Sequence, residues 1–99
     1  MMEPPIQASI TLANWEQDHQ QLISVRSRVF IEEQKVAEAL EIDGKDDICQ
    51  HIKALNSNGE IIATARLLPE HYIGRMCVLK PYRRQGVGGR MLTFLIDYA

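Results

Sequence analysis

The spacing of hydrophobic positions changes several times along the chain, and each change predicts a new element. Residues 8–12 alternate between apolar and polar side chains, which predicts a short strand. From Trp15 the apolar spacing lengthens to three or four residues and predicts a helix over residues 15–33. Asn14 is suited to cap this helix, with Gln17 three residues later as the second half of a capping box.

Three further segments of strand length follow, at residues 48–55, 61–68 and 72–79. They are joined by a turn at residues 56–59 and a break at residues 69–70, both too short for a helical crossover, so we expect an antiparallel meander. Gly74 inside the last of these strands indicates a bulge or a close approach of another group. Before them, a helical turn is expected at residues 37–40 and a tight turn at residues 43–44.

A last helix is predicted from residue 87 onwards, because apolar side chains recur on one of its faces. Those side chains are Val87, Met91, Leu92, Leu95 and Ile96. The expected fold is therefore α+β: a mostly antiparallel sheet of about four strands, a long N-terminal helix, and a C-terminal helix that follows a glycine-rich loop.

Composition describes one ordinary globular domain over residues 1–99, with 45% hydrophobic residues and a net charge of −2. This charge gives no reason to expect nucleic acid or an anionic membrane as partner. The chain has no apolar run of membrane-spanning length and no signal-peptide pattern at its start, so a cytoplasmic location is expected. Cys49 and Cys77 lack metal-binding or redox spacing, and we expect two buried free thiols and no metal site.

Charge is unevenly distributed along the chain. Residues 32–47 hold seven acids and two lysines, whereas residues 71–96 hold no acid and several arginines. The acidic run is interpreted either as a solvated loop or as a region that attracts a cationic ligand. Arg66 and Arg75, on two of the predicted strands, are expected to pair with this acidic segment.

The arginine-rich region contains three glycines in four positions, Gly86, Gly88 and Gly89, between a strand and a helix. Backbone N–H groups and a helix N-terminus in this arrangement are suited to an anion. A nucleoside-triphosphatase loop is excluded because Arg90 and Met91 stand where Lys and Ser or Thr are needed. A dinucleotide loop is excluded because its third glycine is Met91 here and no strand follows.

What remains is an Arg-x-x-Gly-x-Gly string at residues 83–88, which resembles the coenzyme A loop of the GNAT acetyltransferase superfamily. Other segments, in the same order, resemble the bacterial ElaA-like branch of that superfamily. They are residues 25–34 (Val-Arg-x-x-Val-Phe-x-x-Glu-Gln), 41–46 (Glu-x-Asp-Gly-x-Asp), His51, residues 63–69 (Ala-Thr-Ala-Arg-Leu-Leu-Pro) and 73–76 (Ile-Gly-Arg-Met).

The resemblance implies acetyl-CoA as cosubstrate and a small-molecule or peptide primary amine as acceptor. It implies that backbone N–H groups of the loop bind the pyrophosphate, with Arg83 assisting, and that the main chain of residues 76–78 pairs with the pantetheine arm. The residues so implied are Met76, Cys77, Val78, Arg83, Arg84, Gln85, Gly86, Val87, Gly88 and Gly89.

Direct attack by the amine, without an acyl-enzyme, is also implied, so Cys77 is not expected to act as a nucleophile. Glu33, which closes the long helix, is the first candidate for the base or the amine-binding carboxylate, with a plain surface carboxylate as the alternative. His51 is the second candidate, with a structural histidine as the alternative. Glu41 and Asp43 are the next candidates for this role.

Members of the superfamily continue beyond this helix with a further strand that forms the other wall of the coenzyme cleft. We therefore expect residues 1–99 to be a domain incomplete at its C-terminus. Two rival functions remain: a non-catalytic module that binds coenzyme A or phosphate, and a module that forms a homodimer through the open edge of its last strand.

Overall fold

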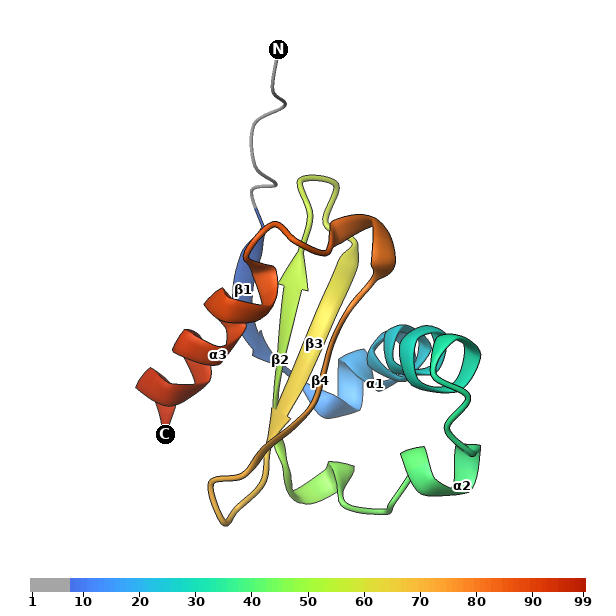
Figure 1. Ribbon diagram of the computed structural model, residues 1–99. Coiled ribbons are helices and arrows are strands. Elements are labelled where there is room, and N and C mark those ends of the chain that lie inside the picture. The colour runs from blue at the N-terminus through green and yellow to red at the C-terminus, as the bar shows by residue number, and fades with distance from the viewer. Residues whose placement is uncertain (1–7) are drawn as a thin grey trace.

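The computed structural model describes residues 8–99 and contains a single antiparallel sheet between two helical layers (Figure 1). The sheet order is β1-β2-β3-β4, so each strand pairs with its neighbour along the chain. The strands are β1 (Ser9–Ala13), β2 (Gln50–Leu55), β3 (Ile61–Leu67) and β4 (Ile73–Val78). The predicted α+β fold with a four-stranded antiparallel meander is confirmed. The start of the chain, on which the signal-peptide argument rested, lies outside the described residues.

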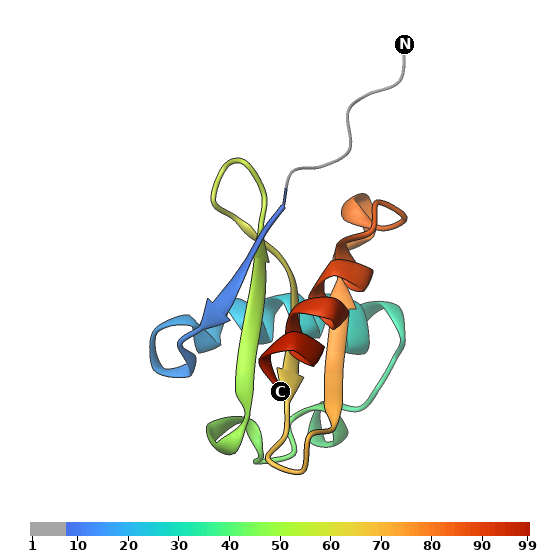
Figure 2. The same cartoon turned by 90° about the vertical axis from the view of Figure 1, so that its left-hand side faces the viewer.

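The helices cover opposite faces of the sheet. Helix α1 (Trp15–Arg26) and its extension pack on one face, and α3 (Val87–Tyr98) packs on the other, in front of the sheet in Figure 2. A short helix, α2 (Glu38–Glu41), lies between α1 and β2, close to the predicted helical turn. Within residues 8–99, no helix has the length and apolar character needed to cross a membrane.

The N-terminus of α1 is capped as predicted, but the capping box closes one residue late. The backbone N–H of Gln17 donates to the Asn14 side chain at 3.2 Å, while the N–H of Asn14 donates to the carboxylate of Asp18 at 3.0 Å. The negative charge of a carboxylate at this position is also stabilised by the positive end of the helix dipole. The predicted partner, Gln17, contributes only its backbone.

The predicted helix over residues 15–33 has the expected extent but two different geometries. After Arg26 the chain continues as a π-helix, Ser27–Glu33, in which the turns are wider than in an α-helix. The N–H of Gln34 donates to the carbonyl of Val29 at 3.1 Å, which closes this segment. Such wide turns occur often at functional sites. Glu33 is the last residue of this wide segment.

The strand predicted over residues 48–55 begins later, at Gln50. Asp46–Ile48 form a 3-10 turn instead, and its closing bond runs from the N–H of Cys49 to the carbonyl of Asp46. Cys49, which follows this turn, is only partly buried, so the prediction of a buried thiol is wrong there, whereas Cys77 is buried as expected. This 3-10 turn in the acidic segment was not indicated by the sequence periodicity.

Strand β4 contains the bulge expected near Gly74. Gly74 lies opposite Arg66, and Cys77 lies opposite Thr64, so β4 has one residue more than β3 in this interval. The left-handed residue is Arg75, at φ 49°, and not the glycine. A left-handed arginine is uncommon and requires outside contacts to hold it, and these contacts come from the α2 segment.

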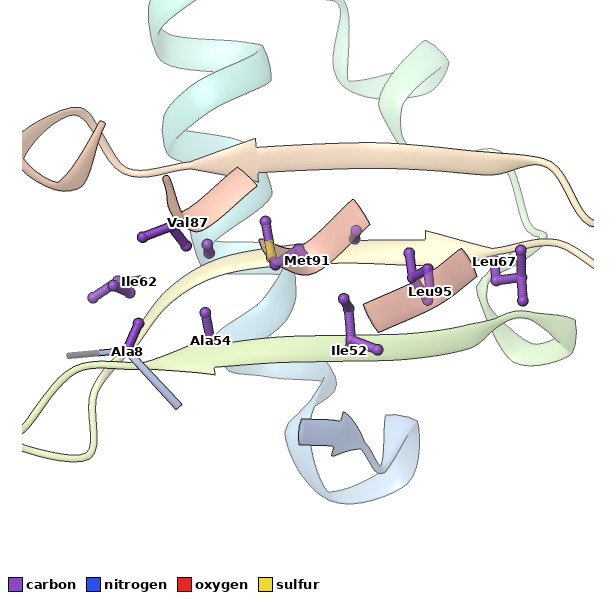
Figure 3. Packing of buried hydrophobic residues seen from close by; sticks show 10 residues of the cluster. Ala8, Ile52, Ala54, Ile62, Leu67, Val87, Met91 and Leu95 are labelled. Carbon is purple, nitrogen blue, oxygen red and sulfur yellow. The ribbon is translucent and has the colours of Figure 1, made fainter. Parts of the chain in front are cut away.

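The hydrophobic core has two parts, one on each face of the sheet. The larger part lies between the sheet and α3, where Val87, Met91 and Leu95 point at the strands (Figure 3). The prediction that Leu92 and Ile96 share this buried face is wrong, because their side chains are 42% and 60% exposed. The buried positions of α3 are four residues apart, whereas Leu92 and Ile96 each follow a buried position by one residue and therefore lie to the side of the face that contacts the sheet.

Candidate functional site

The glycine loop connects the end of β4 to the start of α3 through a 3-10 turn, Lys80–Tyr82. Two of its residues are left-handed: Arg84 at φ 64° and Gly86 at φ 82°. Left-handed residues in a tight turn direct successive backbone N–H groups toward the same side, which forms a concave site for anions. Gly86 is also the N-cap residue of α3.

The first turn of α3 supplies free donors to this loop. The N–H of Arg90 donates to the carbonyl of Gly86 at 3.0 Å, and this is the first closing bond of the helix. The N–H groups of Val87, Gly88 and Gly89 come before this bond in the chain, and the helix has no carbonyl that could accept a hydrogen bond from them. These donors lie at the positive end of the helix dipole, where negative charge is stabilised.

The space beside these donors is open. At the point where a β-carbon would stand on Gly89, no side chain or distant backbone atom lies within 4 Å, and at Gly88 the nearest atom is Cγ2 of Val78 at 4.0 Å. A broad hollow of about 540 Å³ borders Gly86 and Gly89 and continues between α3 and β1. The loop is therefore open at the β-carbon positions of these two glycines and borders a hollow at the start of α3.

Arg83 stands at the entrance of the loop with all three guanidinium nitrogens engaged. Its Nε donates to the carbonyl of Val78 at 2.8 Å, and its Nη1 and Nη2 donate to the two carboxylate oxygens of Glu33 at 2.9 and 2.8 Å. The structure thus joins the first predicted catalytic residue to the leading residue of the predicted phosphate loop. The hydrogen bonds from Arg83 lower the pKa of Glu33 below its usual range.

Strand β4 presents the second part of the predicted coenzyme site. It is the last strand of the sheet, and within residues 8–99 no strand pairs with its outer edge. Met76, Cys77 and Val78 lie on this strand, so their main chain can accept an added extended segment. Burial raises the pKa of the Cys77 thiol to about 12, which keeps it protonated and poorly nucleophilic.

The other charged region of the molecule is a buried ionic network at the opposite end of β4. Arg26, on α1, is 1% exposed and donates to Glu41 and, at 2.7 Å, to Asp46. Arg66, on β3, donates to the same Asp46 oxygen at 2.9 Å and to Asp43. The predicted pairing of Arg66 with the acidic segment is confirmed.

Arg75 completes this network from the bulge. Its guanidinium donates to the carbonyls of Leu40 and Glu41, both at 3.0 Å, and lies within 3.6 Å of the Glu41 carboxylate. These carbonyls belong to the end of α2, so Arg75 fixes the helical turn against β4. The predicted role of Arg75 as a partner of the acidic segment is confirmed, and its contacts account for its left-handed backbone.

The acidic segment is therefore not simply a solvated loop. Glu41 and Asp46 are 2% and 6% exposed, and burial of a carboxylate requires paired charge. The hydrogen bond from Arg66 holds the pKa of Asp43 well below its usual range. For Asp46, burial acts to raise the pKa, but the bonds from Arg26 and Arg66 outweigh it and the pKa is lowered. Glu41 and Asp43, the later candidates for a base, are engaged in this network.

His51 also lies in this buried region. Its ring is 1% exposed, stacks on the indole of Trp15 with centroids 4.4 Å apart, and places Nε2 at 2.9 Å from the carbonyl of Asp46. Burial lowers the pKa of this imidazole. The strand that carries it, β2, is separated from β4 by β3, so the structure does not bring His51 together with the loop. Its contacts are those of a structural histidine.

Arg26 is the member of the network that sequence reasoning missed. It occupies the same helical face as Leu22, Val25 and Val29, all buried. A charged residue at a core position of an amphipathic helix, with unpaired acids nearby in the sequence, is the signal that indicates a buried pair. Within residues 8–99, no cluster of His, Cys, Asp or Glu side chains has the arrangement of a metal site.

Comparison with known proteins places these features in a family. Residues 11–99 match the model of the acetyltransferase (GNAT) family. The Bacillus subtilis protein YyaT is 38% identical over 78 residues, which cover 74% of this chain and 53% of YyaT, so the chain spans about half the length of this relative.

The fold also occurs in solved structures of other proteins. An acyl-CoA N-acyltransferase from Pseudomonas aeruginosa superposes with a TM-score of 0.74 at 26% identity, over 95% of this chain and 68% of that one. The GNAT family N-acetyltransferase YhbS from Escherichia coli, in complex with CoA, gives a TM-score of 0.74 at 18% identity, over 99% and 59%. The sequence match over residues 11–99 establishes that the chain belongs to the GNAT acetyltransferase family.

Proposed function

We propose that the protein is an acetyltransferase that binds acetyl-CoA at the glycine loop and transfers its acetyl group to a primary amine. The observation that carries the proposal is the open cradle of N–H groups at the start of α3, directly after a strand with a free edge. The CoA complex of the structural neighbour YhbS supports the choice of ligand. Within the family we assign the chain to the ElaA-like branch, on the sequence segments quoted above.

The pyrophosphate of the coenzyme would be held by backbone N–H groups of residues 84–89, with charge from Arg83 beside them. The pantetheine arm would extend along β4 and pair with the main chain of Met76, Cys77 and Val78 in the manner of an added strand. The positions of the loop and of β4 support this arrangement, because the loop begins where the strand ends.

The reaction needs little covalent help from the protein. The amine nitrogen attacks the thioester carbonyl carbon, the carbon–sulfur bond breaks, the amine loses a proton to a base, and the thiolate leaves and is protonated. Positioning of the two reactants supplies much of the rate enhancement. The raised pKa of Cys77 supports direct attack without an acyl-enzyme, since a protonated thiol is a poor nucleophile.

Glu33 is the residue that we propose to bind the amine. It lies beside the loop, and the hydrogen bonds from Arg83 lower the pKa of its carboxylate. A carboxylate with a low pKa is a weak base but a good partner for a cationic amine. We therefore assign Glu33 to acceptor binding ahead of proton abstraction. His51 remains the second candidate for proton abstraction, although its buried contacts favour a structural role.

A non-catalytic module that binds coenzyme A is the alternative function. One observation favours it: every candidate for the base already has a partner in the chain. Glu33 is bonded to Arg83 and His51 to Asp46, while Glu41 and Asp43 belong to the buried network. The alternative predicts acetyl-CoA binding without acetyl transfer to any amine.

The test is the substitution Gly88→Glu, compared with Gly88→Gln as a control of similar size without charge. The fold should tolerate both, since the nearest atom to a new β-carbon is 4.0 Å away and an acid near a helix N-terminus is favourable. Calorimetry should show acetyl-CoA binding weakened about 100-fold by the glutamate, because it places a negative charge against the phosphates, and less by the glutamine.

Unchanged affinity in Gly88→Glu would remove the loop from the proposal. Release of the coenzyme thiol, measured with a panel of primary amines, then separates the two functions. Release that depends on an amine supports the acetyltransferase, whereas tight binding without release supports the non-catalytic module.

A further inference from the structure

The contact between Glu33 and Arg83 joins two segments that are 50 residues apart in the sequence. Both side chains are about one third exposed, at 35% and 37%, so the pair lies at the surface and contributes little to folding. Its bidentate geometry nevertheless holds the guanidinium in one orientation at the mouth of the glycine loop. The pair therefore affects how the loop can bind an anion.

The donor edge of Arg83 that Glu33 occupies is also the edge that a phosphate would use. Guanidinium presents a planar fork that fits a carboxylate or a phosphate in the same bidentate manner. The third nitrogen, Nε, is already bonded to the carbonyl of Val78, which fixes the direction of the fork. A phosphate that takes the fork must therefore displace the Glu33 carboxylate.

The charge around Glu33 supports the same conclusion. Its carboxylate lies in the field of three cations, Arg83, Lys80 and Arg28, all of which lower its pKa. Before any ligand arrives, Glu33 is thus the anion that neutralises the positive region beside the loop. An incoming anion meets a weaker field than the cations alone would give.

We propose that Glu33 is an internal competitor for Arg83, and that a phosphate ligand of the glycine loop displaces it. The inference rests on the proposed function, because it takes the phosphates of coenzyme A as the ligand. Two consequences follow. Glu33 weakens binding of the coenzyme, and binding of the coenzyme releases the Glu33 carboxylate for the cationic acceptor.

The test measures the affinity of CoA for the full chain by calorimetry at fixed ionic strength. Glu33→Gln should bind CoA about threefold to fivefold more tightly, because the competing anion is gone. Glu32→Gln is the matched control: it removes an exposed acid from the adjacent position and should leave the affinity within about twofold. Pantetheine, which lacks the phosphates, should bind both variants as it binds the wild type.

A double-mutant cycle separates competition for Arg83 from a general charge effect. In the Arg83→Gln background, Glu33→Gln should no longer raise the affinity for CoA. Glu33→Asp retains the charge but shortens the reach, so it should give part of the gain, and it serves as a second variant should Glu33→Gln fail to fold.

The outcomes distinguish this inference from the proposed function. Wild-type full-length protein that does not bind CoA overturns both. Wild-type chain that binds CoA, with Glu33→Gln equal to it or weaker, overturns the competition alone and shows instead that Glu33 is neutral or holds Arg83 ready for the ligand. A gain that persists without Arg83 also overturns the competition.

Discussion

The two ends of β4, which lie at opposite ends of the sheet (Figure 1), differ in how their charged side chains are placed. At its start, Arg75 joins a buried network in which Arg26 and Arg66 hold Glu41, Asp43 and Asp46. At its end, the glycine loop has free N–H groups, open space and a surface ion pair. Both regions are rich in arginine, yet only the second has donors that face a possible ligand.

The difference shows that burial decides what a charged residue does. In the network, the charges of three arginines and three acids balance one another within the protein, so the region is suited to fix the acidic segment in place. At the loop, the charge remains near solvent and can be exchanged between partners. Substitutions that are equivalent in charge should therefore affect stability in one region and binding in the other.

The largest loss of stability is expected for Arg26→Met, which removes an arginine from the buried network. The change leaves the carboxylates of Glu41 and Asp46 without their shared partner, and should lower the free energy of unfolding by about 3–5 kcal/mol. Urea denaturation followed by circular dichroism measures it. Arg28→Met, at an exposed position of the same helical segment, should cost less than about 0.5 kcal/mol. A loss below about 1 kcal/mol for Arg26→Met contradicts the role assigned to the network.

A smaller loss of stability is expected when the pH is lowered, because His51 is buried. Burial lowers the pKa of its imidazole in the folded chain, so the unfolded chain binds more protons once the pH falls below about 6.5. The stability present above that pH should therefore decline as the pH falls toward 5, by at most about 1.4 kcal/mol per pH unit.

His51→Phe keeps an aromatic ring against Trp15 but cannot titrate, and should flatten this decline in denaturation curves recorded from pH 7.5 to 5. The exposed His71 provides the control, and His71→Asn should leave the decline as it is, since asparagine tolerates the left-handed backbone at φ 68°. An equal decline in His51→Phe would mean that another group is responsible.

The smallest effect on stability is expected for Glu33→Gln. Its pair with Arg83 lies at the surface, where ion pairs contribute little, so the urea midpoint should not change measurably. The same variant should change CoA affinity, as argued above. A large loss of stability would place this pair with the buried network and remove the distinction between the two regions.

Much of the fold could be predicted because local patterns and the final structure agree. The alternation in the strands, the Asn14 cap and the turn at Gly59 each have a cause within a few residues. Burial on α3 was harder to predict: the helical spacing that identifies Val87, Met91 and Leu95 also includes Leu92 and Ile96, and only the position of the sheet decides between them.

The candidate site was predictable in one part and not in the other. The glycine loop has a local signature, because its backbone conformation, its missing side chains and the helix start all lie within seven residues. The contacts of Glu33 with Arg83, and of Arg26 with Glu41, join distant segments, and no local pattern indicates which arginine meets which acid. The choice of Glu33 as the first candidate depended on its place at the end of the predicted helix, and the π-helical turns that set its position could not be predicted from spacing.

The extra residue in β4 has a consequence for the faces of the strand. Side chains in a regular strand alternate, so Ile73 and Val78, five positions apart, would lie on opposite faces. In this chain both pack in the cluster under α3, while Cys77 packs toward α1. Deletion of one residue at Arg75 would restore strict alternation, and the side chains of either the first or the second half of β4 would then lie on the opposite face of the sheet. The number of residues in this strand is therefore as much a part of its design as their identity.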